Sequence, residues 1–190
     1  QTNQGNFINF WIARFNSDGT GYETDYCGGF LILDKTNFPN NRYNYSQAVA
    51  IQSDGKIVMS GGMMDDDAVG QISLVRLNQD SSPDTSTFGT NGKGTVIVAV
   101  PNYFSYKSSL ALQADGKIVV AGTANIYYSN PNENLAVARF NGNGALDTTF
   151  GGTGIVFTDF GANEFGADVH LQADGRIVVV GTSSASGSSN

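Results

Sequence analysis

The stretch QSDGKIV at residues 52–58 decides the fold, because QADGKIV at residues 113–119 and QADGRIV at residues 172–178 repeat it. From 52 to 113 is 61 residues and from 113 to 172 is 59, so the copies are evenly spaced. A second marker keeps the same period, an arginine followed by an apolar residue and an asparagine, at Arg14, Arg76 and Arg139. Two markers in phase indicate a duplicated unit of about sixty residues.

Each complete unit contains four short apolar stretches bounded by Gly, Asp and Asn. Their lengths and composition favour short β-strands over any helical spacing. The stretches are residues 48–51, 56–60, 71–77 and 94–100 in one unit, and residues 109–112, 117–121, 134–140 and 154–158 in the next. The sequence therefore predicts an all-β chain with a four-stranded antiparallel sheet in each unit.

The repeated Asp-Gly pair lies between the first and second strands of each unit. Asp-Gly between two apolar runs predicts a tight hairpin with a type I′ turn, in which both central residues have positive φ. The second strand is apolar at consecutive positions, for example at residues 57–59 and 118–120. Such a run is typical of a strand buried on both faces, so we expect another sheet on each side of it.

The arginine of the third strand has an aspartate eight residues later in two units, as Arg76 with Asp84 and Arg139 with Asp147. The first unit has Tyr22 at that offset from Arg14. We expect a bidentate ion pair that holds the turn after the third strand. A structural role is favoured over catalysis, because equivalent copies would otherwise mean several active sites.

Four-stranded antiparallel sheets packed face to face are the blades of a β-propeller. The strings LQADGKIVVAGT, LAVARFNGNGALDTTFG and GTGIVFTDFG resemble the delta-60 repeats, a family of bacterial β-propeller repeats. The resemblance covers nearly the whole chain and is strongest from Leu110 to Thr182. It implies a propeller in a secreted or surface protein, with no assigned catalytic activity and no site residues to transfer.

The order of the strands predicts a single array over residues 1–190 that starts and ends in mid-blade. We expect a half-blade at 1–45, a blade at 46–107, a blade at 108–166 and a half-blade at 167–190. Propellers typically close with four to eight blades, so three blade-equivalents do not easily form a ring.

An unfinished blade leaves backbone donors and acceptors open for pairing. The chain itself is the first expected partner: the half-blades of two copies would complete each other head to tail, as a six-bladed ring of two chains or as a filament. The alternatives are the remaining blades of a longer chain, or closure within one chain. The residues expected at the assembly edges are Phe10, Ile12, Arg14, Ile177 and Val179.

A second hypothesis is recognition of a glycan or a surface protein by variable, aromatic segments, expected to be loops on one face. Aromatic rings beside polar residues suit a sugar ring or a protein partner, although they also suit local packing at the blade ends. The residues of this expected recognition face are Tyr43, Tyr45, Tyr103, Phe104, Tyr106, Tyr127 and Tyr128.

Composition excludes several classes of partner. The net charge is −7 with ten Lys and Arg residues, which argues against nucleic acid and anionic membranes. No apolar run reaches the roughly twenty residues that a membrane-spanning helix needs. Cys27 is the only cysteine, so no intrachain disulfide forms, and the abundance of Gly, Ser, Thr and Asn leans toward an extracellular or cell-surface protein.

No catalytic motif is present, so we expect a non-enzymatic protein without a cofactor. A glycan-processing enzyme is a third hypothesis, which needs paired acidic residues in a central funnel. Asp65, Asp66 and Asp67 suggest calcium, but they lack the alternating spacing of a calcium loop and are expected to form a solvated tip. His170 is the only histidine and is expected to pack in a core or an interface.

Overall fold

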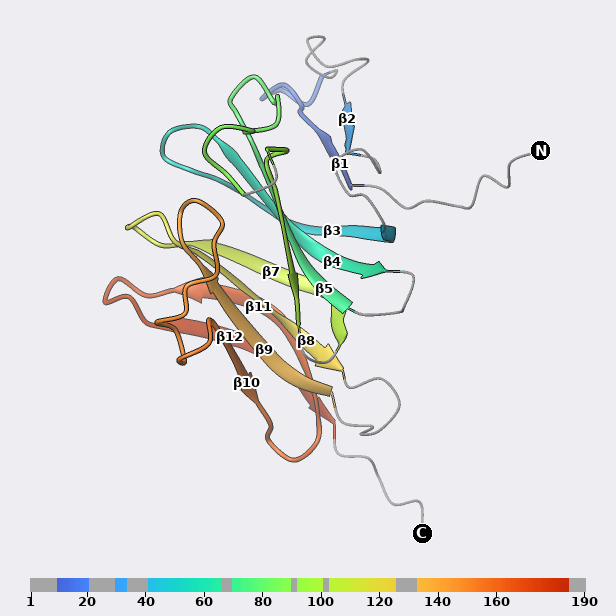
Figure 1. The fold of residues 1–190 in the computed structure, drawn as a ribbon, viewed down its shortest axis with the longest axis vertical. Coiled ribbons are helices and arrows are strands. Elements are labelled where there is room, and N and C mark those ends of the chain that lie inside the picture. The colour runs from blue at the N-terminus through green and yellow to red at the C-terminus, as the bar shows by residue number, and fades with distance from the viewer. Residues whose placement is uncertain are drawn as a thin grey trace, which may run out of the picture.

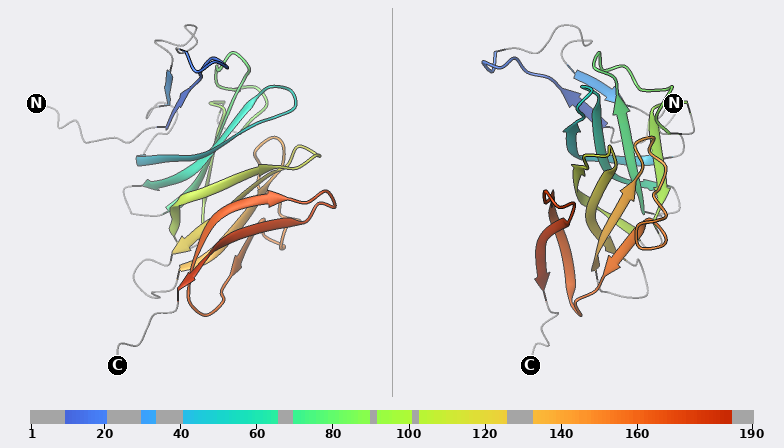
Figure 2. Two further views of the ribbon diagram at one scale, coloured as in Figure 1. Left: turned by 180° about the vertical axis from the view of Figure 1, so that it is seen from behind. Right: turned by 90° about the vertical axis from the view of Figure 1, so that its left-hand side faces the viewer.

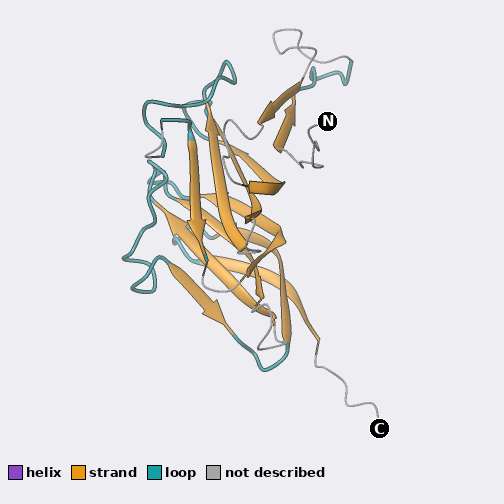
Figure 3. Cartoon of the chain, turned by 45° about the vertical axis from the view of Figure 1, so that its right-hand side comes forward, coloured by secondary structure: helices purple, strands orange, loops and turns teal. Residues whose placement is uncertain are grey.

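The computed structural model describes residues 10–20, 30–33, 41–65, 70–89, 92–100, 103–125 and 133–184. Every strand and turn in these ranges belongs to an all-β architecture, as Figure 3 shows. No helix in these ranges has the length and apolar character to cross a membrane. The expectation of an all-β chain is confirmed.

Two complete four-stranded sheets form the middle of the molecule. The first contains β3 (Asn41–Ile51), β4 (Ile57–Asp65), β5 (Gly70–Leu77) and β6 (Thr95–Ala99), paired in that order. The second contains β7 (Tyr103–Leu112), β8 (Ile118–Asn125), β9 (Glu133–Phe140) and β10 (Ile155–Thr158), again in chain order. All pairs are antiparallel, which confirms the expected blades.

A two-stranded sheet lies at each end of the array. β1 (Phe10–Ala13) pairs with β2 (Phe30–Leu33), and β11 (Asn163–Leu171) pairs with β12 (Ile177–Ser184). In the unit, β1 and β2 correspond to the third and fourth strands, whereas β11 and β12 correspond to the first and second. The two ends are therefore complementary halves of one four-stranded sheet.

The sheets stack in chain order along the long axis of the molecule (Figure 1). β7 contacts the strands β3, β4 and β5 of the sheet before it, and β11 contacts β7, β8 and β9. Figure 2 shows the same order from two other sides, with β11 and β12 at the opposite end from β1 and β2. Each neighbouring pair of sheets thus forms one joint.

Each of the three joints has its own apolar core. Phe10 of β1 packs with Ile57, Met59, Val75 and Leu77 of the first complete sheet. A larger core between the two complete sheets includes Val58, Ile72, Ile118 and Val120, and a third joins Val119, Ala121 and Val137 to Val169. Neighbouring residues of β4 and of β8 therefore belong to different cores, which confirms burial of this strand on both faces.

The hairpin between the first two strands is present, but the predicted turn type is wrong. Gly55, Gly116 and Gly175 have positive φ, whereas the preceding aspartates do not. The Gln52 amide donates to the Lys56 carbonyl, and the Gly55 amide donates to the Gln52 carbonyl. This is a three-residue loop in which a type I turn is followed by a left-handed glycine, so only one positive φ is required.

Candidate functional site

The two complete units share one ion pair, between an arginine and an aspartate of the same sheet. Arg76 Nε lies 2.9 Å from Asp84 Oδ2, and Arg139 Nε lies 2.8 Å from Asp147 Oδ2. The contact is made through Nε alone and not through two nitrogens, because the terminal nitrogens of Arg76 are used elsewhere: Nη2 donates to the carbonyl and hydroxyl of Thr87. The expected pairs exist, and the expected bidentate form is wrong.

Asp84 is almost fully buried and is held by several donors. Lys56 Nζ lies 2.9 Å from Asp84 Oδ2, and the Thr87 hydroxyl donates to the same oxygen at 2.7 Å. Burial works to raise the pKa of Asp84, but the hydrogen bonds from Thr87 and Lys56 and the charge of Arg76 outweigh it and hold the pKa well below its usual range. This group is a structural clamp, because its carboxylate is enclosed and fully engaged.

The same arginines also connect neighbouring sheets. Arg76 Nη1 donates to the carbonyl of Gly142 in the following sheet. Arg14 Nη2 donates to the carbonyl of Gln79, 3.1 Å away, and Gln79 is the third residue after Arg76 just as Gly142 is the third after Arg139. Next to the contact of Arg76 with Gly142, the Gly89 amide donates to the Asn143 carbonyl at 2.9 Å. Arg14 and Arg76 therefore each make the same contact across a joint.

Arg139 occupies this position in the last complete sheet, and among the described residues the following sheet contains β11 and β12 alone. Its side chain is 21 % exposed, against 6 % for that of Arg76. Nε binds Asp147 and Nη2 binds the Thr149 hydroxyl, both within its own sheet. For Arg76 the acceptor across the joint is the carbonyl of Gly142, three residues after the next arginine. The equivalent acceptor for Arg139 would lie three residues after Arg14, in the turn that follows β1.

The open end at β12 is the candidate functional site. Among the described residues β12 pairs with β11 and with no other strand. Val178 is 40 % exposed and Val180 is 54 % exposed, whereas Val58 and Val119, at the position of Val178, are fully buried. The expectation that this second strand is buried on both faces is wrong here, because no sheet among the described residues lies against the face that carries Val178 and Val180.

The five residues expected at the assembly edges mostly face cores of their own chain. Phe10 is buried and Ile12 packs beside it, while Ile177 and Val179 are half-buried in the core next to β8 and β9. Arg14 binds Gln79 and Ser81. The outward apolar side chains are their neighbours in the alternating strands: Trp11, Phe15, Val178 and Val180. Sequence reasoning missed these four, although the alternation of strand side chains could have identified them.

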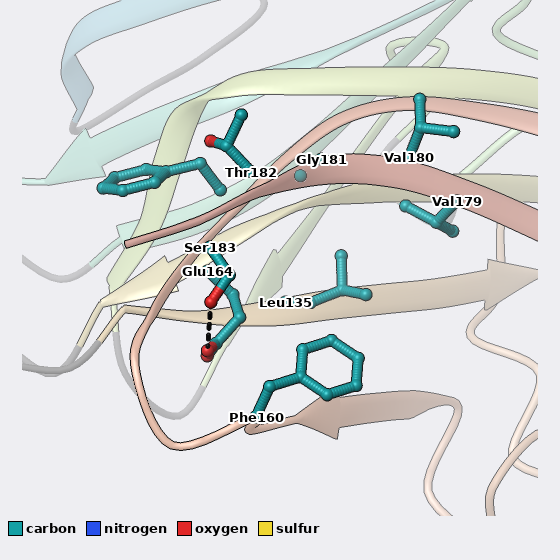
Figure 4. A pocket seen from close by; sticks show the side chains of 10 residues that line it. Leu135, Phe160, Glu164, Val179, Val180, Gly181, Thr182 and Ser183 are labelled. Atoms are coloured by element: carbon teal, nitrogen blue, oxygen red, sulfur yellow. Dashed lines mark hydrogen bonds between the residues drawn. The ribbon is translucent and has the colours of Figure 1, made fainter. Parts of the chain in front are cut away.

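A cavity of about 150 Å³ lies at the open end, between the last complete sheet and β11–β12 (Figure 4). Leu135 of β9 and Phe160 form one wall, and Val179, Val180 and Gly181 of β12 lie opposite. Phe160 is 70 % exposed, while Val100, at the same position in the previous unit, is buried. Between the two complete sheets the equivalent of Phe160 is covered by the next sheet, whereas at the open end Phe160 is exposed.

Glu164 gives this cavity a buried carboxylate. It is 3 % exposed, and its Oε1 accepts hydrogen bonds from the Ala162 amide at 3.1 Å and from the Ser183 hydroxyl at 3.5 Å (Figure 4). Glu164 Oε2 is buried without a hydrogen-bond partner among the described residues. A buried carboxylate oxygen of this kind is costly and calls for a donor.

The expected recognition residues lie mainly on strands and not on loops. Tyr43 and Tyr45 belong to β3, and Tyr103, Phe104 and Tyr106 belong to β7, because β3 and β7 begin about five residues before the expected boundaries at 46 and 108. Tyr45 is half-buried. Tyr127 and Tyr128 lie outside the described residues. Recognition of a glycan or a surface protein stays a prediction.

The other expected sites contribute little to the open end. Asp65 is the last residue of β4, and Asp66, Asp67 and Cys27 lie outside the described residues. In the part of the chain that the structure describes, no three His, Cys, Asp or Glu residues are grouped as metal ligands. The His170 side chain is 78 % exposed beside Asp168, so it is not in a core, and a role at an interface stays a prediction.

A family model described as a β-propeller domain of unknown function (DUF5122) matches residues 52–86, 113–150 and 172–190. Each matched segment begins at the glutamine of the repeated QxDG turn, so the match follows the sixty-residue unit. A search of the curated proteins found no match to this chain. The match agrees with the four-stranded antiparallel sheets and supports a β-propeller fold, and the function of the matching family is unknown.

Proposed function

We propose that this chain is a non-enzymatic structural protein, acting at the cell surface or outside the cell, that assembles head to tail. In this proposal β12 of one copy accepts β1 and β2 of the next copy, and together they complete a four-stranded blade. The observation that supports it is the distribution of exposed apolar side chains. They are concentrated at the two ends, on unit positions that the internal joints bury.

At the β12 end, the positions of Val178 and Val180 face forward, toward the sheet that would follow. Val119 and Ala121, at the same positions of β8, are buried in the core that includes β11 and β12. At the other end, Val49 and Ile51 of β3 are 60 % and 71 % exposed. Val49 corresponds to Val169, which is buried against Val119 and Ala121. Val178 and Val180 of one copy therefore suit Val49 and Ile51 of another.

The strand edges suit each other as well. In the complete sheets the second and third strands pair Val58 with Arg76 and Val119 with Arg139. Continuing this register joins Val178 of one copy to Arg14 of the next, and Val180 to Ile12. Phe15 then takes the position of Leu77 and Phe140, which are fully buried in the complete sheets, whereas Phe15 is 59 % exposed in the single chain. Backbone pairing and apolar burial would both be gained.

The test is the mass of the 190-residue chain in solution, measured by light scattering over a range of concentrations. We expect species of at least twice the 20.1 kDa of one chain, and electron microscopy distinguishes a two-chain ring from a filament. Val180→Asp places a charge on the forward face of β12 and should leave the chain monomeric, because an unpaired charge cannot be buried in the new joint.

Phe157→Asp is the matched control for Val180→Asp. Phe157 is 38 % exposed, and Ile97, at the same position beside a complete joint, is still 36 % exposed. A charge at residue 157 therefore should not block assembly. A folded wild-type chain that stays at 20.1 kDa at every concentration would overturn the proposal. The alternative partner of β12 would then be strands of a longer polypeptide.

A further inference from the structure

We propose that Trp11 of one copy anchors the joint by entering the cavity beside Gly181 of the next copy, where its indole N–H donates to Glu164 Oε2. This inference rests on the proposed head-to-tail assembly and names the residues that would make it specific. Trp11 is the only tryptophan of the chain, and it is 63 % exposed on β1.

The register places Trp11 beside the cavity. In the first complete sheet Gly61 of β4 pairs with Ser73 of β5, and in the second Gly122 of β8 pairs with Ala136 of β9. Gly181 is the residue of β12 at the position of Gly61 and Gly122. The residue three before the arginine, which is Ser73 or Ala136 in the complete sheets, is Trp11 in the first unit. The completed blade would therefore pair Gly181 with Trp11 of the second copy.

The side chain at this position points toward the cavity side of the joint. Ala136 is fully buried in the core between the two complete sheets, together with Ile72 and Val100 of the preceding sheet. At the open end, Leu135 stands at the position of Ile72 and Phe160 at that of Val100. Leu135 of β9 and Phe160, which follows β10, both line the cavity (Figure 4). Trp11 would thus face Leu135 and Phe160.

Polar chemistry adds a second, independent observation. Glu164 Oε2 lines the joint as a buried acceptor with no partner among the described residues. The indole of a buried tryptophan carries one N–H, which needs an acceptor. Because Trp11 would supply the donor and Glu164 the acceptor, one contact satisfies both groups. Seated in this way, Trp11 has the features of an interface hot spot: a large aromatic ring in a mainly apolar pocket.

Trp11 fluorescence gives a direct test because no other tryptophan contributes. As the chain is concentrated from monomer to assembly, we expect the emission to shift to shorter wavelength and quenching by acrylamide to fall. Trp11→Ala should weaken association by about 30-fold or more, the effect of losing a hot-spot residue. Trp11→Phe keeps a ring but removes the N–H, and should weaken association by about tenfold. Phe157→Ala is the control and should change it less than about twofold.

A double-mutant cycle isolates the contact with the carboxylate. Glu164→Gln should weaken association of the wild-type chain but add nothing in the Trp11→Phe background, because the donor is already gone. Circular dichroism of the dilute variants checks that each one folds. Additive effects of the two substitutions would refute the N–H contact.

The two proposals fail in different ways. If light scattering shows assembly while Trp11 emission and quenching stay unchanged, the anchor is wrong and head-to-tail assembly stands. If the folded chain stays monomeric, both are wrong.

Discussion

Arg76 and Gly142 are joined across two sheets: the guanidinium that closes the turn of one blade also donates to a carbonyl in the turn of the next. The same guanidinium lies over the ring of Phe88, 4.5 Å from its centroid, and pairs with buried Asp84. One side chain therefore couples the fold of a blade to the packing between blades.

Arg76→Ala should lower the free energy of unfolding by about 3 kcal/mol, since it removes contacts in two sheets and leaves Asp84 with fewer donors. Urea unfolding of dilute protein measures the change. Arg176→Ala is the matched control, because the ion pair of Arg176 with Asp174 is exposed and should contribute less than about 1 kcal/mol. Equal losses in both variants would contradict the structural role of Arg76.

Acid should weaken the fold through Asp84. Its pKa is lowered in the folded chain, where hydrogen bonds from Thr87 and Lys56 and the charge of Arg76 overcome the opposing effect of burial. The stabilisation is complete above the unfolded pKa of about 3.9 and is lost as the pH falls below that value toward the lower folded pKa. Urea midpoints at neutral pH and at about pH 3 should therefore differ more in the wild type than in Asp84→Asn. A difference of the same size in Asp84→Asn would show that other groups carry the acid sensitivity.

Gly19→Ala should weaken assembly more than it weakens the single chain. Gly19 has a φ of +77° and open space around it, while Gly144, at the same unit position, has side-chain atoms of Val96 and Phe88 where a Cβ would lie. In a completed joint Gly19 would face Val156 and Phe150 of another copy. Gly116→Ala, with a φ of +83° and open space, carries the same backbone strain of about 1 kcal/mol inside a complete blade and should leave association unchanged. Equal association constants for the two variants would place Gly19 outside the joint.

Phe140 and Phe15 stand at the same position of the repeat, but Phe140 is buried and Phe15 is exposed, so Phe140→Ala and Phe15→Ala should have different effects. Phe140 is fully buried, so its loss should cost about 3 to 5 kcal/mol of stability. Phe15 is 59 % exposed, so its loss should cost less than about 1 kcal/mol in dilute protein and appear instead as weaker association. Thermal unfolding of dilute samples and light scattering of concentrated ones measure the two effects. A large stability loss for Phe15→Ala in the monomer would show that it is already packed there.

The repeat made most of the fold predictable. The period, the four strands of each unit and the pairs Arg76–Asp84 and Arg139–Asp147 all follow from local patterns in the sequence. The turn type could not be predicted in this way, because Asp54 and its equivalents keep negative φ and a glycine alone supplies the left-handed residue. The extent of β3 and β7 was also missed, since aromatic and polar residues such as Tyr45 and Tyr103 continue a strand without the apolar pattern that marks its centre.

The candidate site was only partly predictable. Aligning the arginines already sets Trp11 against Ser73 and Ala136, and a large ring opposite two small residues is a signal that the sequence contains. The burial of Glu164 and the cavity beside Gly181 depend on how β11 packs against the preceding sheet. Contacts between distant segments of this kind have no local pattern.

The dissimilar ends formed by β1–β2 and β11–β12 give any open assembly a direction. A growing fibre would show a bare valine edge at one tip and an exposed tryptophan at the other, so the two tips would offer different surfaces to a binding protein. A protein that caps one tip would leave the other free to extend, and fibre length would then depend on the ratio of cap to subunit.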